Sequence, residues 1–475
     1  MEDARGNVSE FRWQMPDDRN QTIQESIAPR PYHFVIPGFR ESVKSSFSLL
    51  PLASCLLLLL IISLPMPMVL AQQTANPVRL IHADSLIGYT SGGDSYRELV
   101  GHVELVHDST TLRCDRAVQN LTTDIVNLFG DVQVNDDTLT LLTKQATYNG
   151  NTRTVSSNVG VYLNDRKRTL TADSGMYDSQ TKVARFYGNV FVRDSVSRLT
   201  ADSLVYYRDE QKTISNGHVK IRSIQNNVTV YGAHFEDYSR KSYSRMTGKP
   251  LLVQIDTTSD GKIDTLFITS TRMEAYRDSS NERFVAEDSV IVLRDSLAAR
   301  CGYAIYFSKD SIVTMQKAPV VWYGDNQLTG DSIAVYIENR NISRVDVVGA
   351  SFAISRSDSL LLNRFNQLKG KKLTMYLSHQ KVDRIIVENN ATSLYYLYDK
   401  NKPNGVNKVS GDRVVMYFKG GKIDRIAVMS GVEGDYYPEK IIDGRISHYN
   451  LAGFAYYRDR PDLKDFPSGW IGEAK

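Results

Sequence analysis

The sequence predicts an all-β protein in which repeated strands form a jelly-roll-like open trough. The stretch Leu170–Arg193 contains two alternating runs, LTADSGMY and ARFYGNVFV, joined by the polar turn DSQTK. A second copy of this unit follows over Leu199–Arg222. The chain also contains 27 tyrosines, a residue type that favours pleated, half-buried surfaces. The hairpin-like links DSQTK and RDEQK favour antiparallel pairing, and a parallel β-helix is the alternative architecture.

Two landmarks recur with a nearly constant period, which identifies a repeated supersecondary unit. The first is an aspartate in the LTADS-type strand, with successive positions 31, 29, 29 and 29 residues apart: Asp84, Asp115, Lys144 in the matching slot, Asp173 and Asp202. The second is a glycine that opens a G-x-V strand, with SNVGV from Ser157 filling one slot: Gly101, Gly130, Gly188 and Gly217. A glycine at this place suits a turn with positive φ or a close backbone approach.

The repeat continues with longer units towards the C-terminus. LTGDSIAVY, LKGKKLTMY and VSGDRVVMY are each followed by a second motif, whose arginines Arg344, Arg384 and Arg425 are 40 and 41 residues apart. These patterns predict the following organisation: a disordered extension at 1–45, a signal peptide or membrane anchor at 46–72, a β-repeat domain at 78–223, a second, looser β-repeat region at 224–455 and a polar tail at 456–475 that frays or serves as an interaction tail.

The apolar segment near the N-terminus predicts export from the cytoplasm. A basic flank precedes the run Leu49–Leu70, Pro65 and Pro67 break it, and a small residue follows at Ala71, as in a secretory signal. An uncleaved anchor is the rival interpretation, since about 20 apolar residues span a bilayer. A third is lipidation at Cys55, which follows Leu52-Ala53-Ser54.

Composition and motifs indicate no catalytic chemistry, no metal site and no cofactor. The net charge of +3 argues against nucleic-acid binding, which needs clustered basic residues. His102 and His218 share a slot with Asp131 and Asn189, so we expect a solvent-facing turn rather than metal ligands.

The other recurrent polar residues also have a structural interpretation. Asp84, Asp115, Asp173, Asp202, Asp331 and Asp412 are expected to form a polar ladder on the outer face. The stretch DTTSDGKID at 256–264 lacks the calcium-loop spacing and predicts a hairpin turn. Cys114 and Cys301 are expected to be core thiols, with a disulfide between repeats as the alternative.

An apolar stripe gives the functional hypothesis. Strict alternation places one set of side chains on the inward side of the strands: Ile81, Ala83, Leu170, Ala172, Met176, Leu199, Ala201 and Val205 from one strand type, and Val103, Val132, Val134, Val190, Val192, Val219 and Ile221 from the other. These residues either fill a dry core or line an apolar groove between walls that do not fully close. Sequence alone leaves both alternatives open.

The series of LTADS strands, tyrosines and G-N-V-x-V strands behind an apolar segment resembles the OstA-like (organic solvent tolerance) family. The resemblance is clearest over residues 78–223 and extends loosely to about residue 430. It implies a periplasmic carrier or bridge, not an enzyme, whose β-trough holds the lipid A chains of lipopolysaccharide and passes them towards the outer membrane.

The resemblance also implies which residues and partners take part. The lipid-binding residues would be Leu170, Ala172, Met176, Phe186, Val190, Val192, Leu199, Ala201, Val205, Val219 and Ile221. The partners would be other lipopolysaccharide-transport proteins, including the outer-membrane translocon, joined through edge strands, or further copies of the chain joined end to end. The competing hypothesis is an exported structural or surface β-repeat scaffold without lipid transport.

Overall fold

The computed structural model describes residues 76–257, 261–278, 282–295, 297–338, 341–357, 361, 363–378, 381–400, 402–420 and 422–469. The chain divides into two units, Met1–Gln73 and Thr74–Lys475, and all described residues belong to the second. The predicted extension at 1–45, the signal or anchor at 46–72 and Cys55 lie outside the described residues.

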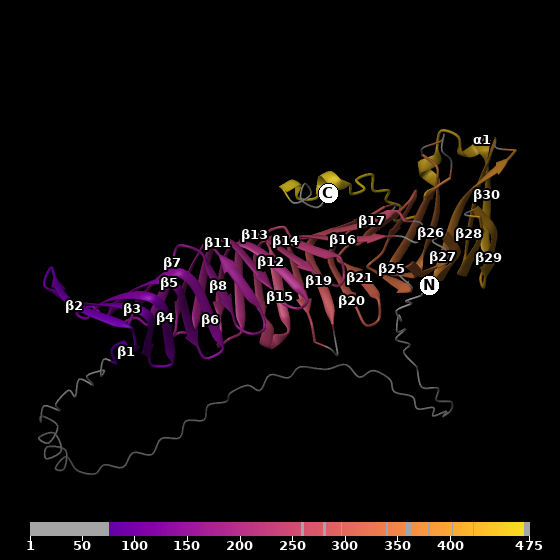
Figure 1. Cartoon of the computed structure of the whole chain (residues 1–475). Helices are drawn as coiled ribbons and strands as arrows, with labels where there is room; N and C mark the ends of the chain where they lie inside the picture. The colour runs from indigo at the N-terminus through magenta and orange to yellow at the C-terminus, as the bar shows by residue number, and fades with distance from the viewer. Residues whose placement is uncertain are drawn as a thin grey trace, which may run out of the picture. The chain divides into compact units, whose positions relative to one another are not determined.

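The described part of the second unit is almost entirely β-structure (Figure 1). The first fourteen strands are β1 (Arg79–His82), β2 (Ser85–Ser91), β3 (Asp94–His107), β4 (Thr110–Asn120), β5 (Ile125–Asp136), β6 (Leu139–Asn149), β7 (Thr154–Ser157), β8 (Val161–Asn164), β9 (Thr169–Ala172), β10 (Ser174–Asp178), β11 (Val183–Arg193), β12 (Ser197–Tyr207), β13 (Lys212–Ser223) and β14 (Val228–Tyr238). The later strands are β15 (Tyr243–Thr247), β16 (Leu251–Thr257), β17 (Ile263–Thr269), β18 (Arg272–Tyr276), β19 (Arg283–Arg294), β20 (Leu297–Phe307), β21 (Ile312–Gln316), β22 (Val320–Tyr323), β23 (Asn326–Thr329), β24 (Ser332–Glu338), β25 (Asn341–Arg356), β26 (Phe365–Ser378), β27 (Lys381–Asp399), β28 (Lys402–Lys419), β29 (Lys422–Met429) and β30 (Glu433–Pro438). The helices are short: α1 (Glu439–Ile442) and the 3-10 helices η1 (Ser239–Lys241), η2 (Ile446–Tyr449) and η3 (Leu463–Asp465).

All of these strands belong to one sheet, and each pairing between described strands is antiparallel. Strands that follow one another in the chain lie side by side along the unit (Figure 1). The predicted antiparallel all-β fold is therefore confirmed, and the parallel β-helix is excluded. The pairing also continues without a break from β13 to β14, across the predicted boundary at residue 223.

Each long strand bends once, at a corner made by the two recurrent landmarks. In β11 the corner is Gly188-Asn189, with φ of 74° and 44°, and the register with β12 shifts between Tyr187 and Val190. These two residues lie opposite the single Asp202 of β12, which makes a β-bulge. The neighbouring Asp173 donates its backbone N–H to the Gly188 carbonyl at 3.0 Å.

The corners divide the sheet into two walls. Wall A contains Asp94–Val100 of β3 and Arg116–Asn120 of β4 together with their counterparts in later strands, and wall B contains Val103–His107 of β3 and Thr110–Cys114 of β4 with theirs. Apolar side chains from both walls pack into one cluster between Val78 and Met246 and a second between Ala286 and Met416. The interior between the walls is thus the hydrophobic core.

The predicted alternation is wrong beyond each corner of the LTADS-type strands. Ala172 and Ala201 are buried in the interior, but the next buried positions are three residues on, at Gly175 and Leu204. The single corner aspartate turns the chain from one wall to the other. If the inward residues have even numbers before the corner, they have odd numbers after it, and the reverse also holds. The prediction that Met176 and Val205 face inward is therefore wrong.

The segment after α1, including residues 456–469 of the predicted polar tail, packs along the outer face of wall B (Figure 1). The buried Gln367 of β26 donates to Asn450 at 2.6 Å and accepts the Leu451 N–H at 2.9 Å. The buried Gln327 of β23 pairs in the same way with both backbone groups of Tyr457. Further on, Phe466 is 4% exposed. It packs against a cluster formed by Tyr231, Leu251 and Val253.

Candidate functional site

The candidate site is the apolar interior between the two walls over residues 78–246. Seven of the predicted residues are buried there: Leu170, Ala172, Phe186, Val190, Leu199, Ala201 and Val219. Val192 and Ile221 are partly buried and pack against the same cluster. Met176 and Val205 lie on the other face of their strands and are half-buried. Sequence reasoning missed Tyr148, Tyr177, Leu204 and Tyr206, which are all interior residues.

The interior is closely packed rather than open. Leu105, Leu128, Phe186 and Val219 are each 0% exposed, so the side chains of one wall contact those of the other. Of the two alternatives left by the sequence, the structure has the filled core. An apolar ligand would therefore need the walls to separate.

Polar contacts join the walls on the side opposite the corners, and we call this line of contacts the seam. On wall A, Tyr148, Tyr177 and Tyr206 end their strands at intervals of 29 residues. On wall B, His107 and Asp136 end theirs at the same interval. His107 Nδ1 lies 2.8 Å from the Tyr148 hydroxyl. The buried faces of the walls are thus sealed by side-chain hydrogen bonds.

Asp136 is the most connected residue of the seam. Its carboxylate is 0% exposed and accepts hydrogen bonds from Tyr177 Oη at 2.5 Å and Lys182 Nζ at 2.6 Å, both from wall A or its turn. Ser109 donates from wall B at 3.0 Å. Arg208, on the next turn of wall A, donates to the Asp136 carbonyl at 3.2 Å. A buried carboxylate is retained in a protein when its lone pairs are satisfied in this way.

Weaker contacts continue the seam on both sides. Arg153 and Asp108 form an ion pair at 2.8 Å between the turns of the two walls, with both side chains more than one-third exposed. The Arg168 guanidinium lies 5.3 Å from the ring centre of Tyr206. An exposed ion pair contributes at most about 1 kcal/mol, and a partly buried cation–π contact contributes about 1–2 kcal/mol. The rung around Asp136 therefore dominates closure of the seam.

The seam should weaken in acid. Burial alone would raise the pKa of Asp136, but hydrogen bonds from Lys182, Tyr177 and Ser109 outweigh it and hold the pKa below the ordinary 3.8. A depressed folded pKa contributes stability above the unfolded pKa, and that stability is lost as the pH falls through the folded value. We expect faster hydrogen exchange of the amides in β5, β10 and β12 below about pH 4.

This acid effect can be assigned by substitution. Asp136→Asn removes the titrating group, so exchange in these strands should become nearly independent of pH below about pH 4 once intrinsic exchange rates are subtracted. An unchanged pH dependence in this variant would contradict the assignment.

The recurrent aspartates lie on the outside of the corners, as predicted, and Asp84, Asp173 and Asp202 each have a side-chain partner that sequence reasoning missed. Asp173 accepts from Asn189 Nδ2 at 2.8 Å, and Asp84 lies 2.9 Å from His102 Nδ1. In one repeat Lys144 takes the place of the aspartate. The residue after the glycine is then Asp131, and Lys144 and Asp131 form an ion pair at 2.5 Å. The carboxylate and its partner exchange places, but the side-chain contact across the corner is kept. The signal for it was present in the sequence as this paired substitution.

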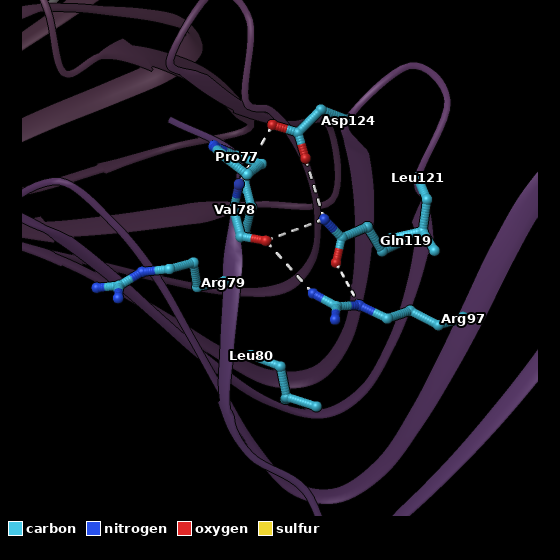
Figure 2. A pocket seen from close by; sticks show the side chains of 8 residues that line it. All are labelled: Pro77, Val78, Arg79, Leu80, Arg97, Gln119, Leu121 and Asp124. Carbon is cyan, nitrogen blue, oxygen red and sulfur yellow. Dashed lines mark hydrogen bonds between the residues drawn. The ribbon is translucent and has the colours of Figure 1, made fainter. Parts of the chain in front are cut away.

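A small pocket of about 370 Å³ lies at the N-terminal end of the interior (Figure 2). Val78, which is 3% exposed and belongs to the interior cluster, fills the end of that interior. Asp124 accepts the Val78 N–H, and Gln119 donates to its carbonyl, each at 3.3 Å. Gln119 lies one repeat before Tyr148, at the position that the seam tyrosines occupy in the later repeats. Both polar and apolar side chains line the pocket, which adjoins the end of the packed interior.

The remaining candidates are structural. Cys114 and Cys301 are free and buried, so the disulfide alternative is wrong, and burial raises the pKa of each thiol to about 11. Within the described residues, no cluster of three or more His, Cys, Asp or Glu side chains could hold a metal ion. Among the helices that the structure describes, none has the length and apolarity needed to cross a membrane.

Comparisons with known proteins give consistent results. Residues 75–231 match the family model for OstA-like proteins, and residues 169–341 match the model for the LptA/(LptD N-terminal domain) LPS transport proteins. The chain is also similar to the crystal structure of LptH, the LptA homologous periplasmic component of the conserved lipopolysaccharide transport device from Pseudomonas aeruginosa. That similarity has 12% sequence identity, covers 30% of this chain and 95% of that chain, and has a TM-score of 0.24. A search of curated proteins gives no significant match.

Proposed function

This chain is an OstA-like protein over the residues that the two family models match, and we propose that it is a periplasmic bridge that carries lipopolysaccharide towards the outer membrane. The lipid A chains would lie in the interior between walls A and B. The observation that carries this proposal is the apolar interior, in which buried hydrophobic side chains form one cluster from Val78 to Met246 over the region matched by the OstA-like model.

Access to the interior requires the seam to open. Burying an acyl chain yields about 0.8 kcal/mol per CH₂, so a chain of roughly a dozen carbons gains on the order of 10 kcal/mol. Breaking a buried charge cluster such as that at Asp136 costs about 3–5 kcal/mol. The gain from one acyl chain therefore exceeds the cost of opening one rung. Because the apolar positions of successive rungs are alike, the lipid would gain similar burial at each rung, and the cluster at Asp136 would be the largest barrier to its movement along the stack.

The ends of the stack offer edges for neighbouring proteins. Every residue of β2 is exposed, including Leu86 and Ile87 at 54% and 56%, and among the described strands β2 pairs only with β3. At the other end, the described strands that pair with β29 and β30 are limited to β28. Unpaired strand edges favour β-augmentation. We propose that other lipopolysaccharide-transport proteins, or further copies of this chain, pair at these edges.

Site-specific photo-crosslinking in cells tests the lipid site. A photoreactive residue at Phe186 or Leu204, both interior, should trap lipopolysaccharide. The matched positions Met176 and Val205 lie on neighbouring strands but face outward, and they should trap little. Equal labelling at inward and outward positions, or labelling at neither, would rule out an interior lipid site.

The filled interior also supports a second candidate, an exported scaffold whose core never opens. The near-zero exposure of Leu105, Leu128 and Phe186 is the observation in its favour. In that case depletion of the protein would leave the lipid composition of the outer membrane unchanged, and the crosslinking positions would label only protein.

A further inference from the structure

A continuous row of aromatic and cationic side chains runs along the outer face of wall A, and we call it the rim row. Its members are directly opposed, one after another, in the register of fourteen strands: Tyr207, Lys212, Tyr238, Tyr243, Tyr276, Arg283, Phe307, Ile312, Tyr336, Arg344, Tyr376, Arg384, Tyr417 and Arg425. The row contains five cations and no carboxylate. The 40- and 41-residue spacing of its last three arginines is the motif noted in the sequence.

The rings and cations of the row stack on one another. Arg344 lies 3.7 Å from the ring centre of Tyr336, and Arg384 lies 4.6 Å from that of Tyr376. Arg425 lies 4.4 Å from the ring centre of Tyr417. Each contact is a cation–π interaction. Alternation with tyrosine holds the guanidinium groups in a fixed line, about two strand spacings or roughly 10 Å apart.

At its start, the row borders the seam. In β12, Tyr206 is buried and faces the seam, while the next residue, Tyr207, begins the row on the opposite face. A ligand whose apolar part lay between the walls would leave at the seam, and its polar part would meet the outer rim of wall A.

The charges around the two halves of the row differ. Near its start, Glu236 and Glu274 accept hydrogen bonds from the hydroxyls of Tyr238 and Tyr243, so carboxylates surround this half. Near its end, Asp346 lies 3.4 Å from Arg344.

Arg384 and Arg425 form no ion pair with any residue that the structure describes. The neighbouring Asp383 and Asp424 are exposed, one residue before each arginine. The half from Tyr336 to Arg425 is therefore the part with available positive charge.

We infer that the segment Tyr336–Arg425 of the rim row binds a phosphorylated saccharide chain. A guanidinium presents a planar set of donors that matches phosphate in a bidentate geometry. Tyrosine faces provide flat apolar surfaces for the C–H faces of sugar rings, and the roughly 10 Å spacing of the arginines is on the scale of two linked rings. This inference rests on the proposed function, in which the saccharide is the polar part of the same lipopolysaccharide.

Cross-strand pairs of this kind also stabilise a sheet, so the test must separate binding from stability. The probe is a deacylated, phosphorylated core oligosaccharide, with binding to the full chain measured by titration calorimetry. Arg384→Gln with Arg425→Gln should weaken binding at least tenfold. The matched control is Arg198→Gln with Arg222→Gln, an exposed, directly opposed pair on wall B, which should change binding less than twofold.

Three further arms make the result decisive. Tyr376→Leu, which keeps an apolar cover but removes the ring, should weaken binding several-fold, and urea unfolding checks that each variant is folded. The dephosphorylated oligosaccharide should lose most of the affinity, and inorganic phosphate alone should bind far more weakly than the oligosaccharide. Phosphate binding as tightly would show a simple anion site and overturn the inference.

The inference and the proposed function can fail separately. No oligosaccharide binding, or equal loss in both arginine pairs, overturns the inference, while lipid crosslinking at Phe186 would still support the interior site. Arginine-dependent oligosaccharide binding without any crosslinking at Phe186 supports the rim row and contradicts the lipid interior.

Discussion

Replacing Asp136 with alanine is expected to destabilise the N-terminal half of the stack by about 3–5 kcal/mol. The substitution leaves Lys182 and the hydroxyl of Tyr177 without the buried acceptor that joins walls A and B. Because repeat arrays unfold locally, hydrogen exchange of the amides in β5 to β12 is the appropriate measurement. Their protection should fall, while the amides of β25 to β28 should be little affected.

Asp137 provides the control for this experiment. It is the next residue and also forms an ion pair, with Arg208 at 2.7 Å, but its side chain is 72% exposed. Asp137→Ala should cost at most about 1 kcal/mol, as is usual for exposed ion pairs. Similar losses in the two variants would contradict the central place of Asp136 in the seam. In the proposed function, Asp136→Ala should also increase lipid crosslinking at Phe186, because the seam opens more readily.

The second large effect is expected from Gly188→Ala at a corner. The backbone there has φ of 74°, which costs a residue with a side chain about 1–2 kcal/mol. The new methyl group would also collide with the Asp173 side chain, and the corner would have to distort. We expect a total loss of about 2–4 kcal/mol, again read from hydrogen exchange of β10 to β12.

Two further variants separate the causes of this loss. Adding Asp173→Ala to Gly188→Ala should recover the part due to the collision but not the part due to φ. Gly88→Ala, in the exposed strand β2 where nothing lies within 4 Å, should be nearly neutral. A full loss that persists in the double variant would show that backbone strain alone makes glycine necessary here.

The repeat could be predicted from the sequence because it depends on period alone, and the antiparallel pairing because the links DSQTK and RDEQK have the length and composition of hairpin turns. Asp84 and Asp173 mark one end of each unit and Gly101 and Gly188 the other, and a constant spacing needs no knowledge of which way a side chain points. The outward position of the aspartates followed from their recurrence on successive rungs, which predicts a polar ladder on the outer face.

The face of each residue could be predicted only up to the corner. Alternation in a straight strand puts Ala172 and Met176 on one side, but the chain turns at Asp173, so Met176 faces outward and Tyr177 inward. The corner residue Asp202 of β12 lies opposite two residues of β11. This difference in number arises from the pairing of the two strands and is not visible in the sequence of either one. A pattern within one strand cannot reveal it.

The seam was missed although a signal for it existed. Tyr148, Tyr177 and Tyr206 keep the 29-residue period, as do His107 and Asp136, and they form a third landmark of the repeat. They were overlooked because tyrosine is abundant in the chain and polar turn residues are expected at strand ends. The tyrosines of the rim row, Tyr336, Tyr376 and Tyr417, similarly share the spacing of their arginines.

The position of Phe466 has a consequence for biogenesis. This side chain covers Tyr231 and Leu251, which precede it by more than 200 residues. During synthesis, strand pairing can begin at the N-terminus, but the outside of wall B near these residues stays uncovered until Phe466 has been added. A chain that stopped before Phe466 would keep this apolar surface exposed to solvent.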